Sequence, residues 1–453
     1  MSPYDSASTD SLAFRQTLRA WLAGQGSNYS VQEARTLLAN ADGQSDWPAL
    51  SRSYNGYVRE LAVRLLARRP GTQALAILLE RANDWVPSIR EQALLGLAAY
   101  LEDVRVPQLL DNLPLLLALS RQQRGDHRPL LQGVQAVLAR PQHHETVRVA
   151  WFALRGQASR FLFRLLAAAD DSFELRAQAL RHPDPVVRTL ALESARTLPA
   201  EARTNLLRLA LGNRSATVRG RALRAWLREA EAPAAALAQS LLDRSASVRS
   251  IALWHAAKLG VEPAQVLAQR STAGLPLRTA EWLGVLGLAA ALGQALPAHW
   301  LTSALAAPSA RVRLAALAQL DDDALPSFIA ALDAPSPKVY HGALERLRKL
   351  PWQVLQAPVS NYLDQRWAVL EPSRREAIFS LLAYWQRLAY LLRRMDNADT
   401  PGDWLKTLRR WSDQRYPALD PLTSESERNT VSERIRQLVD AGQLPKGSLT
   451  CLG

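Results

Sequence analysis

The stretch from Arg181 to Gly260 contains three versions of one short phrase: RHPDPVVRTLALESA from Arg181, GNRSATVRGRALRAW from Gly212, and DRSASVRSIALWHA from Asp243. In each version, a turn containing Asp or Ser precedes Val-Arg. Ala-Leu then begins three residues after that arginine. A phrase that returns about every thirty residues is typical of a repeat protein, in which each unit contacts only its neighbours.

The arginine of this phrase locates the other repeats. We interpret these arginines as a structural spine, although a role in ligand binding stays open. The anchors are Arg59, Arg90, Arg148, Arg188, Arg219, Arg249, Arg278 and Arg313, with Tyr340 at the same place in a further unit. The long interval after Arg90 predicts a degenerate unit around Gly125 to Leu138. The wide interval before Arg188 predicts an insertion near Phe161 to Asp171.

Each phrase also has the features of a helix start. A capping residue stands four positions before most anchors, as Asp184 and Ser215 do, and Pro185 suits the first helical position. The Val, Ala and Leu of the phrase fall on one face of a helix. A second apolar segment, such as NLLRLAL at 205–211, precedes each turn. The predicted unit is therefore a helical hairpin that buries its apolar face only by stacking on its neighbours.

These residues resemble the HEAT-repeat family, especially its short bacterial HEAT-like type, from Asn55 to Leu347. The resemblance implies an all-α, right-handed α-solenoid of stacked hairpins, in which the arginine bonds the turn of the adjacent unit. It also implies that second helices line a concave face. Because the family includes scaffolds, adaptors, lyases and DNA-repair glycosylases, it does not specify a function. Tyr340 in place of arginine and Trp151 in place of alanine depart from the pattern.

We expect three parts in one continuous elongated body. Residues 1–50 are predicted to form N-terminal capping helices, residues 51–350 the repeat array, and residues 351–453 a C-terminal helical cap and tail. Within the last part, Ser373 to Met395 reads as one long amphipathic helix. Thr423 to Thr430 is predicted to interrupt the helices, before a final helix near Val431 to Ala441.

The charge of the chain supports two interpretations. There are 55 basic and 42 acidic residues, which gives a net charge of +13. Such an excess suits nucleic-acid binding, but almost all the basic residues are arginines, as a GC-rich genome would also produce. A single cysteine, Cys451, excludes an internal disulfide framework. With no secretory pattern and no apolar run long enough to span a membrane, we expect a cytoplasmic protein.

A basic surface is the main candidate for ligand binding. Arg221, Arg224 and Arg228 follow one another at helical spacing, and Trp254 and Lys258 occupy the places of Arg224 and Arg228 in the next unit. Such residues on a concave face could meet phosphates and stack on a base. The alternative is a solvated helix face, with Trp254 filling a gap between layers.

Catalytic and metal-binding patterns are missing from the sequence. The histidines show no ligand spacing, and neither a phosphate loop nor a nucleophile motif is present. We expect no metal and no cofactor. A glycosylase would need a carboxylate and aromatic side chains that converge on a groove. The residues of suitable type are Asp84, Trp85, Trp151, Trp226 and Trp254.

The sequence favours a non-enzymatic scaffold or adaptor, monomeric, that binds a partner protein on its concave face. The alternative is a nucleic-acid-binding protein or a HEAT-like DNA-repair glycosylase that uses the basic segment at 181–260.

Overall fold

The fold is seen in a computed structural model, which describes residues 20–21, 23–26, 28–39, 47–397, 401–412 and 423–450. Much of the segment predicted to form the N-terminal capping helices, residues 1–50, lies outside the described residues, and Cys451 lies wholly outside them. Every regular element in the described part of the chain is a helix. The chain divides into two compact units, Met1–Glu231 and Ala232–Gly453.

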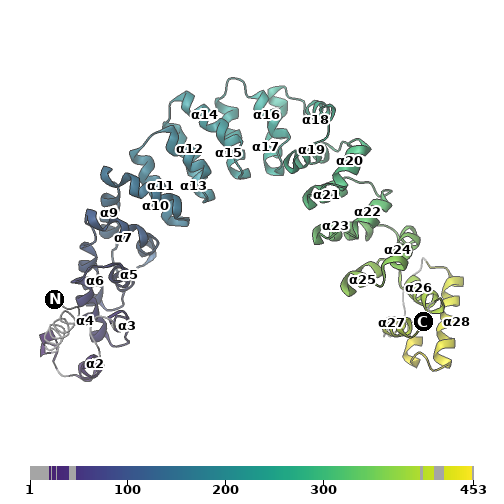
Figure 1. The fold of residues 1–453 in the computed structure, drawn as a ribbon, viewed down its shortest axis with the longest axis horizontal. Coiled ribbons are helices and arrows are strands. Elements are labelled where there is room, and N and C mark those ends of the chain that lie inside the picture. The colour runs from purple at the N-terminus through teal and green to yellow at the C-terminus, as the bar shows by residue number, and fades with distance from the viewer. Residues whose placement is uncertain are drawn as a thin grey trace, which may run out of the picture. The chain divides into compact units, whose positions relative to one another are not determined.

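The first unit consists of short helices joined by tight turns (Figure 1). In chain order they are α2 (Tyr29–Ala39), α3 (Trp47–Leu50), α4 (Gly56–Ala67), α5 (Thr72–Arg81), α6 (Pro87–Ala98), η2 (Asp103–Arg105), α7 (Val106–Asp111), α8 (Leu113–Ala118), η3 (Leu119–Arg121), α9 (Arg128–Leu138), η4 (Pro141–His143), α10 (His144–Ala153), α11 (Gly156–Ala169), α12 (Phe173–Arg181), α13 (Pro185–Glu193), η5 (Ser194–Thr197), α14 (Ala200–Leu211) and α15 (Ala216–Glu229).

The second unit is built in the same way. Its helices are α16 (Ala234–Leu241), α17 (Ala246–Ala256), η6 (Ala257–Leu259), α18 (Pro263–Thr272), α19 (Thr279–Leu292), α20 (Ala298–Leu305), α21 (Ala310–Leu317), α22 (Leu325–Ala331), α23 (Pro337–Leu347), α24 (Trp352–Arg366), α25 (Pro372–Phe379), α26 (Tyr384–Asp396), α27 (Pro401–Ser412), α28 (Glu425–Asp440) and η7 (Lys446–Leu449).

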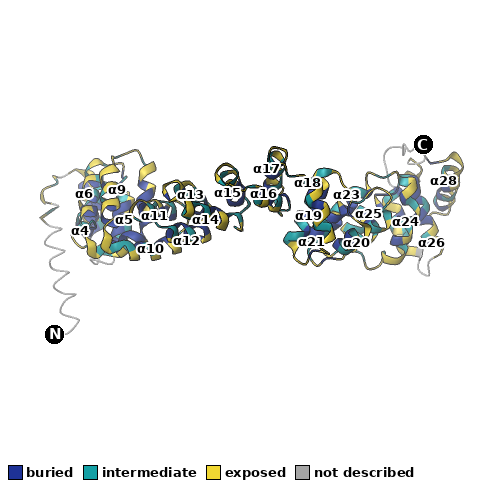
Figure 2. Ribbon diagram, turned by 90° about the horizontal axis from the view of Figure 1, so that it is seen from above, coloured by how far each residue is buried: buried dark blue, intermediate teal, exposed yellow. Residues whose placement is uncertain are grey.

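Neighbouring hairpins stack on one another within each unit. In the first unit, α4 packs on α6, α12 on α14, and α13 on α15. In the second, α19 packs on α21 and α21 on α23. The buried residues lie where these helices face each other (Figure 2). They include the repeated valines and alanines, among them Val187, Ala191, Val218 and Ala222. An all-α architecture of stacked helical hairpins is thus confirmed, in agreement with the prediction from the sequence.

Glycines bring two helices of the second unit into close contact. A Cβ atom added at Gly284 of α19 would overlap the carbonyl oxygen of Leu242, and one added at Gly287 would overlap the guanidinium of Arg249. The bare backbone of α19 therefore provides the space that the preceding hairpin occupies.

The predicted insertion near Phe161 to Asp171 is wrong. Helix α11 runs uninterrupted through most of that segment, and α12 follows after a short turn. The interval from Arg148 to Arg188 is spanned by the consecutive helices α10 to α13. The interval was misleading because Arg148 lies in α10 and the next anchor, Arg188, lies in α13.

Two expectations for the C-terminal part are also wrong. The helix predicted from Ser373 to Met395 is divided into α25 and α26, and Arg387 donates hydrogen bonds to the carbonyl oxygens of Ser380 and Leu382 at the break. The segment expected to interrupt the helices begins one instead. Ser424 and Glu427 form a reciprocal capping box at the start of α28, which places this helix start before Val431.

Candidate functional site

The anchor arginines tie each helix to the turn before it. Where the phrase is regular, the arginine is the fourth residue of its helix and its Nη1 donates to the carbonyl oxygen six residues earlier. This hydrogen bond runs from Arg90 to Asp84, from Arg219 to Asn213 and from Arg249 to Asp243 at 2.8 Å each, and from Arg313 to Ala307 at 2.7 Å. The guanidinium thus satisfies a carbonyl group that the turn leaves without a helical partner.

One anchor also pairs with the next hairpin. The Nε and Nη2 atoms of Arg59 donate to the two carboxylate oxygens of Asp84, at 3.1 and 3.2 Å. The two side chains are only 4% and 1% exposed. Burial by itself raises the pKa of Asp84, but the Val86 N–H and the Arg59 guanidinium outweigh it and hold this pKa below its ordinary value. Asp84, a candidate carboxylate of a glycosylase, is thus engaged in linking two hairpins.

Two of the eight anchor arginines, Arg278 and Arg148, do not lie in the second helix of a hairpin. Arg278 precedes α19, is mostly exposed and pairs with Glu281. The fourth residue of α19 is Trp282, which packs edge-on against Trp300. Arg148 lies in α10, where its Nη2 donates to the carboxylate of Asp170 at 3.1 Å.

Arg176 is an equivalent residue that the sequence reasoning missed. It is the fourth residue of α12, and its Nη1 donates to the carbonyl oxygen of Asp170, six residues earlier. Asp170 thus joins two arginines, because its carboxylate accepts from Arg148 and its carbonyl oxygen accepts from Arg176. Asp84 joins Arg59 and Arg90 in the same way. The phrase was present, because Leu175 precedes this arginine and Ala179-Leu180 follows it. It lay only 12 residues from Arg188, too close for the assumed period.

In α11, a neutral pair replaces the arginine and its acid. Ser159 is the fourth residue, and its hydroxyl lies 3.2 Å from His182 Nε2. His182 Nδ1 accepts from the Asp184 N–H, so Nε2 carries the proton and donates to the Trp151 carbonyl oxygen. Burial lowers the pKa of His182, whose ring stacks on Trp151. Ser159, His182 and Trp151 are all buried, so Trp151 is unable to meet a base.

Arg188 keeps the anchor position without the usual bonds. It is buried, and its Nε and Nη1 have no hydrogen-bond partner among the described residues. The residue that corresponds to Asp84 in the next hairpin is Asn213, whose Nδ2 donates to the Leu180 carbonyl oxygen. Burial, together with the nearby charge of Arg214, lowers the pKa of Arg188. A buried guanidinium in this state costs stability.

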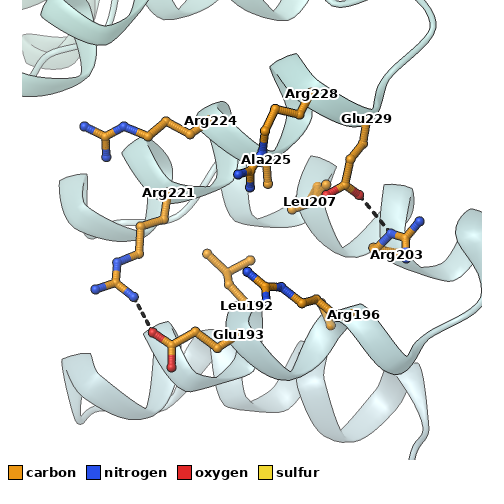
Figure 3. A pocket seen from close by; sticks show the side chains of 11 residues that line it. Leu192, Glu193, Arg196, Arg203, Leu207, Arg221, Arg224, Ala225, Arg228 and Glu229 are labelled. Carbon is orange, nitrogen blue, oxygen red and sulfur yellow. Dashed lines mark hydrogen bonds and ion pairs between the residues drawn. The ribbon is translucent and has the colours of Figure 1, made fainter.

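The three arginines of the candidate surface lie together on α15 and line a pocket of about 300 Å³ (Figure 3). Helix α13, η5 and α14 form its other walls. Its lining residues are Leu192, Glu193, Ala195, Arg196, Arg203, Leu207, Arg221, Arg224, Ala225, Arg228 and Glu229. The candidate residues thus form part of a concave site, together with Arg196 and Arg203. The sequence did not predict Arg196 and Arg203 as site residues, because only packing brings η5 and α14 beside α15.

Two of the five pocket arginines are paired within the pocket. Arg221 bonds Glu193, and Arg203 Nε lies 2.9 Å from Glu229 Oε2. Arg196, Arg224 and Arg228 have no carboxylate partner among the described residues. Figure 3 shows the guanidinium groups of Arg196 and Arg228 directed into the space between the helices, whereas Arg224 extends along the edge. The pocket therefore has an excess of three positive charges.

The other two residues of the predicted basic surface, Trp254 and Lys258, belong to the second unit. Trp254 on α17 is 72% exposed, so it does not fill a gap between layers. The ammonium of Lys258 lies over the Trp254 ring, 5.5 Å from its centroid. The structure thus brings Trp254 and Lys258 to one another. Trp226, on α15, is half-buried with Arg208 over its ring, and Trp85 is exposed beside Arg59.

The described residues form neither a metal site nor a membrane-spanning helix. Among the described residues, no three His, Cys, Asp or Glu side chains are grouped so as to hold a metal ion. No helix in the same part of the chain has the length and apolar character needed to cross a bilayer.

Comparisons with known proteins identify no family for this chain. No family model matches it, and no curated protein matches it. A crystal structure of Kap121p is similar over the whole of this chain and 48% of that chain, with 14% sequence identity and a TM-score of 0.21. The chain therefore spans about half the length of this solved structure, and the likeness is too low to bear on function.

Proposed function

We propose that the protein is a non-enzymatic scaffold that holds a partner protein, with the arginine-lined pocket as the principal contact. The observation that carries this proposal is a set of three arginines around one hollow, Arg196, Arg224 and Arg228, for which the described part of the chain supplies no carboxylate partner. Like charges held close together repel one another, so their surroundings favour an anionic group. A monomeric, cytoplasmic protein accords with this role and stays a prediction.

The pocket differs from an ordinary solvated helix face. Its arginines come from η5, α14 and α15 and surround an apolar floor, whereas a solvated face projects its charges outward into water. A partner side chain that enters the hollow would release water from apolar surface and neutralise charge at the same time. The chemistry supported is recognition, because the pocket lining offers only arginine, glutamate and aliphatic side chains.

Affinity capture from the native cell tests this proposal. The full chain is immobilised, the lysate is treated with nuclease, and retained proteins are quantified for wild type and for Arg196→Glu/Arg228→Glu. A matched control, Arg311→Glu/Lys349→Glu, reverses two charges at exposed positions of the second unit. We expect a stoichiometric partner on the wild type and the control, and its loss on the pocket variant. Equal retention by all three would contradict the proposal.

Nucleic-acid binding is a second candidate, and the exposure of Trp254 favours it. An indole that is 72% exposed beside a lysine resembles the stacking platforms of single-strand binders. Under this candidate, affinity for a single-stranded oligonucleotide falls steeply as salt rises. The substitution Trp254→Ala would then weaken binding by about 1–3 kcal/mol. Weak binding that is unchanged by Trp254→Ala would eliminate this candidate.

A further inference from the structure

We propose that the pocket recognises an acidic segment of its partner, in which one large apolar side chain is flanked by carboxylates. This inference rests on the proposed scaffold function and specifies the chemistry of the partner. It follows from three properties of the pocket: its residual charge, its floor, and the acidic groups at its border.

The residual charge sets the number of anions. Five arginines and two glutamates line the pocket, and two arginine–glutamate pairs are already made. Three guanidinium groups are left. Arg196 and Arg228 are directed inward and Arg224 lies at the edge (Figure 3). Because guanidinium groups bind carboxylates through paired N–H donors, two or three partner carboxylates would complete the site.

The floor calls for an apolar group between those carboxylates. It is formed by aliphatic side chains from three elements, namely Leu192 of α13, Ala195 of η5, and Leu207 of α14, with Ala225 of α15 beside them. Ala195 and Leu207 are buried. A hollow of about 300 Å³ has room for one leucine-sized or phenylalanine-sized side chain with its flanking backbone. An all-polar ligand would leave this floor in contact with water.

The border of the pocket favours a peptide over a nucleic acid. Glu193 and Glu229 hold Arg221 and Arg203 in ion pairs, so only three pocket arginines are left for a ligand, fewer than a continuous phosphate backbone usually contacts. None of the lining residues is aromatic, so the pocket has no surface on which a base could stack. Trp254, the aromatic residue of the predicted basic surface, belongs to the second unit.

Fluorescence anisotropy with labelled peptides tests the inference on the full chain. The probe is an eight-residue peptide with a central leucine flanked by two glutamates on each side. Its controls replace either the glutamates by glutamine or the leucine by serine. We expect measurable binding only for the acidic leucine peptide. Binding should weaken about tenfold for each inward arginine reversed. Arg224→Glu should have a smaller effect than Arg228→Glu, and Arg311→Glu/Lys349→Glu should have none.

Three results would overturn the inference: no binding of the acidic leucine peptide, equal binding of the serine peptide, or tighter binding of an oligonucleotide that is lost in the same pocket variants. Competition separates failure of this inference from failure of the scaffold proposal. If a partner is captured by the wild type and lost on the pocket variant, yet excess acidic peptide does not release it, the scaffold stands and the acidic motif is wrong. If no partner is captured at all, the scaffold proposal itself fails.

Discussion

Arg59 and Arg188 hold the same position in their helices, but their surroundings give them opposite effects on stability. Arg59 is buried against a carboxylate that its guanidinium fully engages. Arg188 is buried beside an asparagine that has committed its amide elsewhere. A buried charge is stable only when it is paired, so the anchor arginine does not contribute equally to stability in every repeat.

Substituting methionine at these two positions should therefore have opposite effects. We expect Arg59→Met to lower the free energy of unfolding of the first unit by about 3 kcal/mol, because Asp84 loses its main partner. Arg188→Met should leave this free energy unchanged or raise it by about 1 kcal/mol. Urea denaturation measures both, with the solvated Arg128→Ala as a control expected to change nothing. Equal destabilisation by the two methionine variants would contradict this assignment.

The buried histidines predict a pH dependence for the first unit. Burial lowers the pKa of both His182 and His127 in the folded chain. An unfolded histidine has a pKa near 6.5. As the pH falls below about 6.5, the unfolded chain therefore takes up protons that the folded chain resists, and stability falls.

Denaturation midpoints measured between pH 7.5 and 5.5 check this expectation. The midpoint of the first unit should decrease toward pH 5.5, and the decrease should be smaller in His182→Gln. A midpoint that is constant or rises as the pH falls would show that these rings are not held neutral in the folded state.

At the level of the element, the hairpins depend on small residues as much as on the arginines. Helix α19 has glycine where the carbonyl of Leu242 and the guanidinium of Arg249 approach it. The alanines of the phrase have the same role in the other helices, where Ala191, Ala222, Ala252 and Ala316 are fully buried. The sequence thus encodes the contact distance between helices through side-chain size.

Adding a methyl group at one such contact tests this interpretation. Gly284→Ala should destabilise the second unit by about 1–3 kcal/mol, because backbone has to move to admit the Cβ. Gly402→Ala in α27 meets no neighbouring atom, so alanine there should be neutral or slightly stabilising. Thermal unfolding followed by circular dichroism distinguishes the two. A Gly284→Ala variant as stable as wild type would show that the close approach is absent in solution.

At the level of the whole molecule, the sequence predicted the fold better than the site. The phrase around Arg219 is local, so its cap, anchor and apolar stripe could be read in order, and the helical hairpins followed. The sequence did not show that Arg148 and Arg278 lie outside the second helices, or that Arg176 holds the anchor position of its own helix. A helix's place in the stack depends on packing, which the local phrase does not encode. Only the wall of the pocket formed by α15 was predicted, since Arg221, Arg224 and Arg228 share that helix. Arg196 and the Glu229–Arg203 pair join it only through tertiary contacts.

Hydrogen exchange of the full chain, with and without the acidic leucine peptide, tests most directly the claim that the arginine-lined pocket receives the partner. We predict slowed amide exchange in η5, α14 and α15, with exchange in Ala232–Gly453 unchanged. The double substitution Arg196→Glu/Arg228→Glu should abolish this protection. Protection confined to the second unit, or protection around Trp254 alone, would show that the partner binds elsewhere.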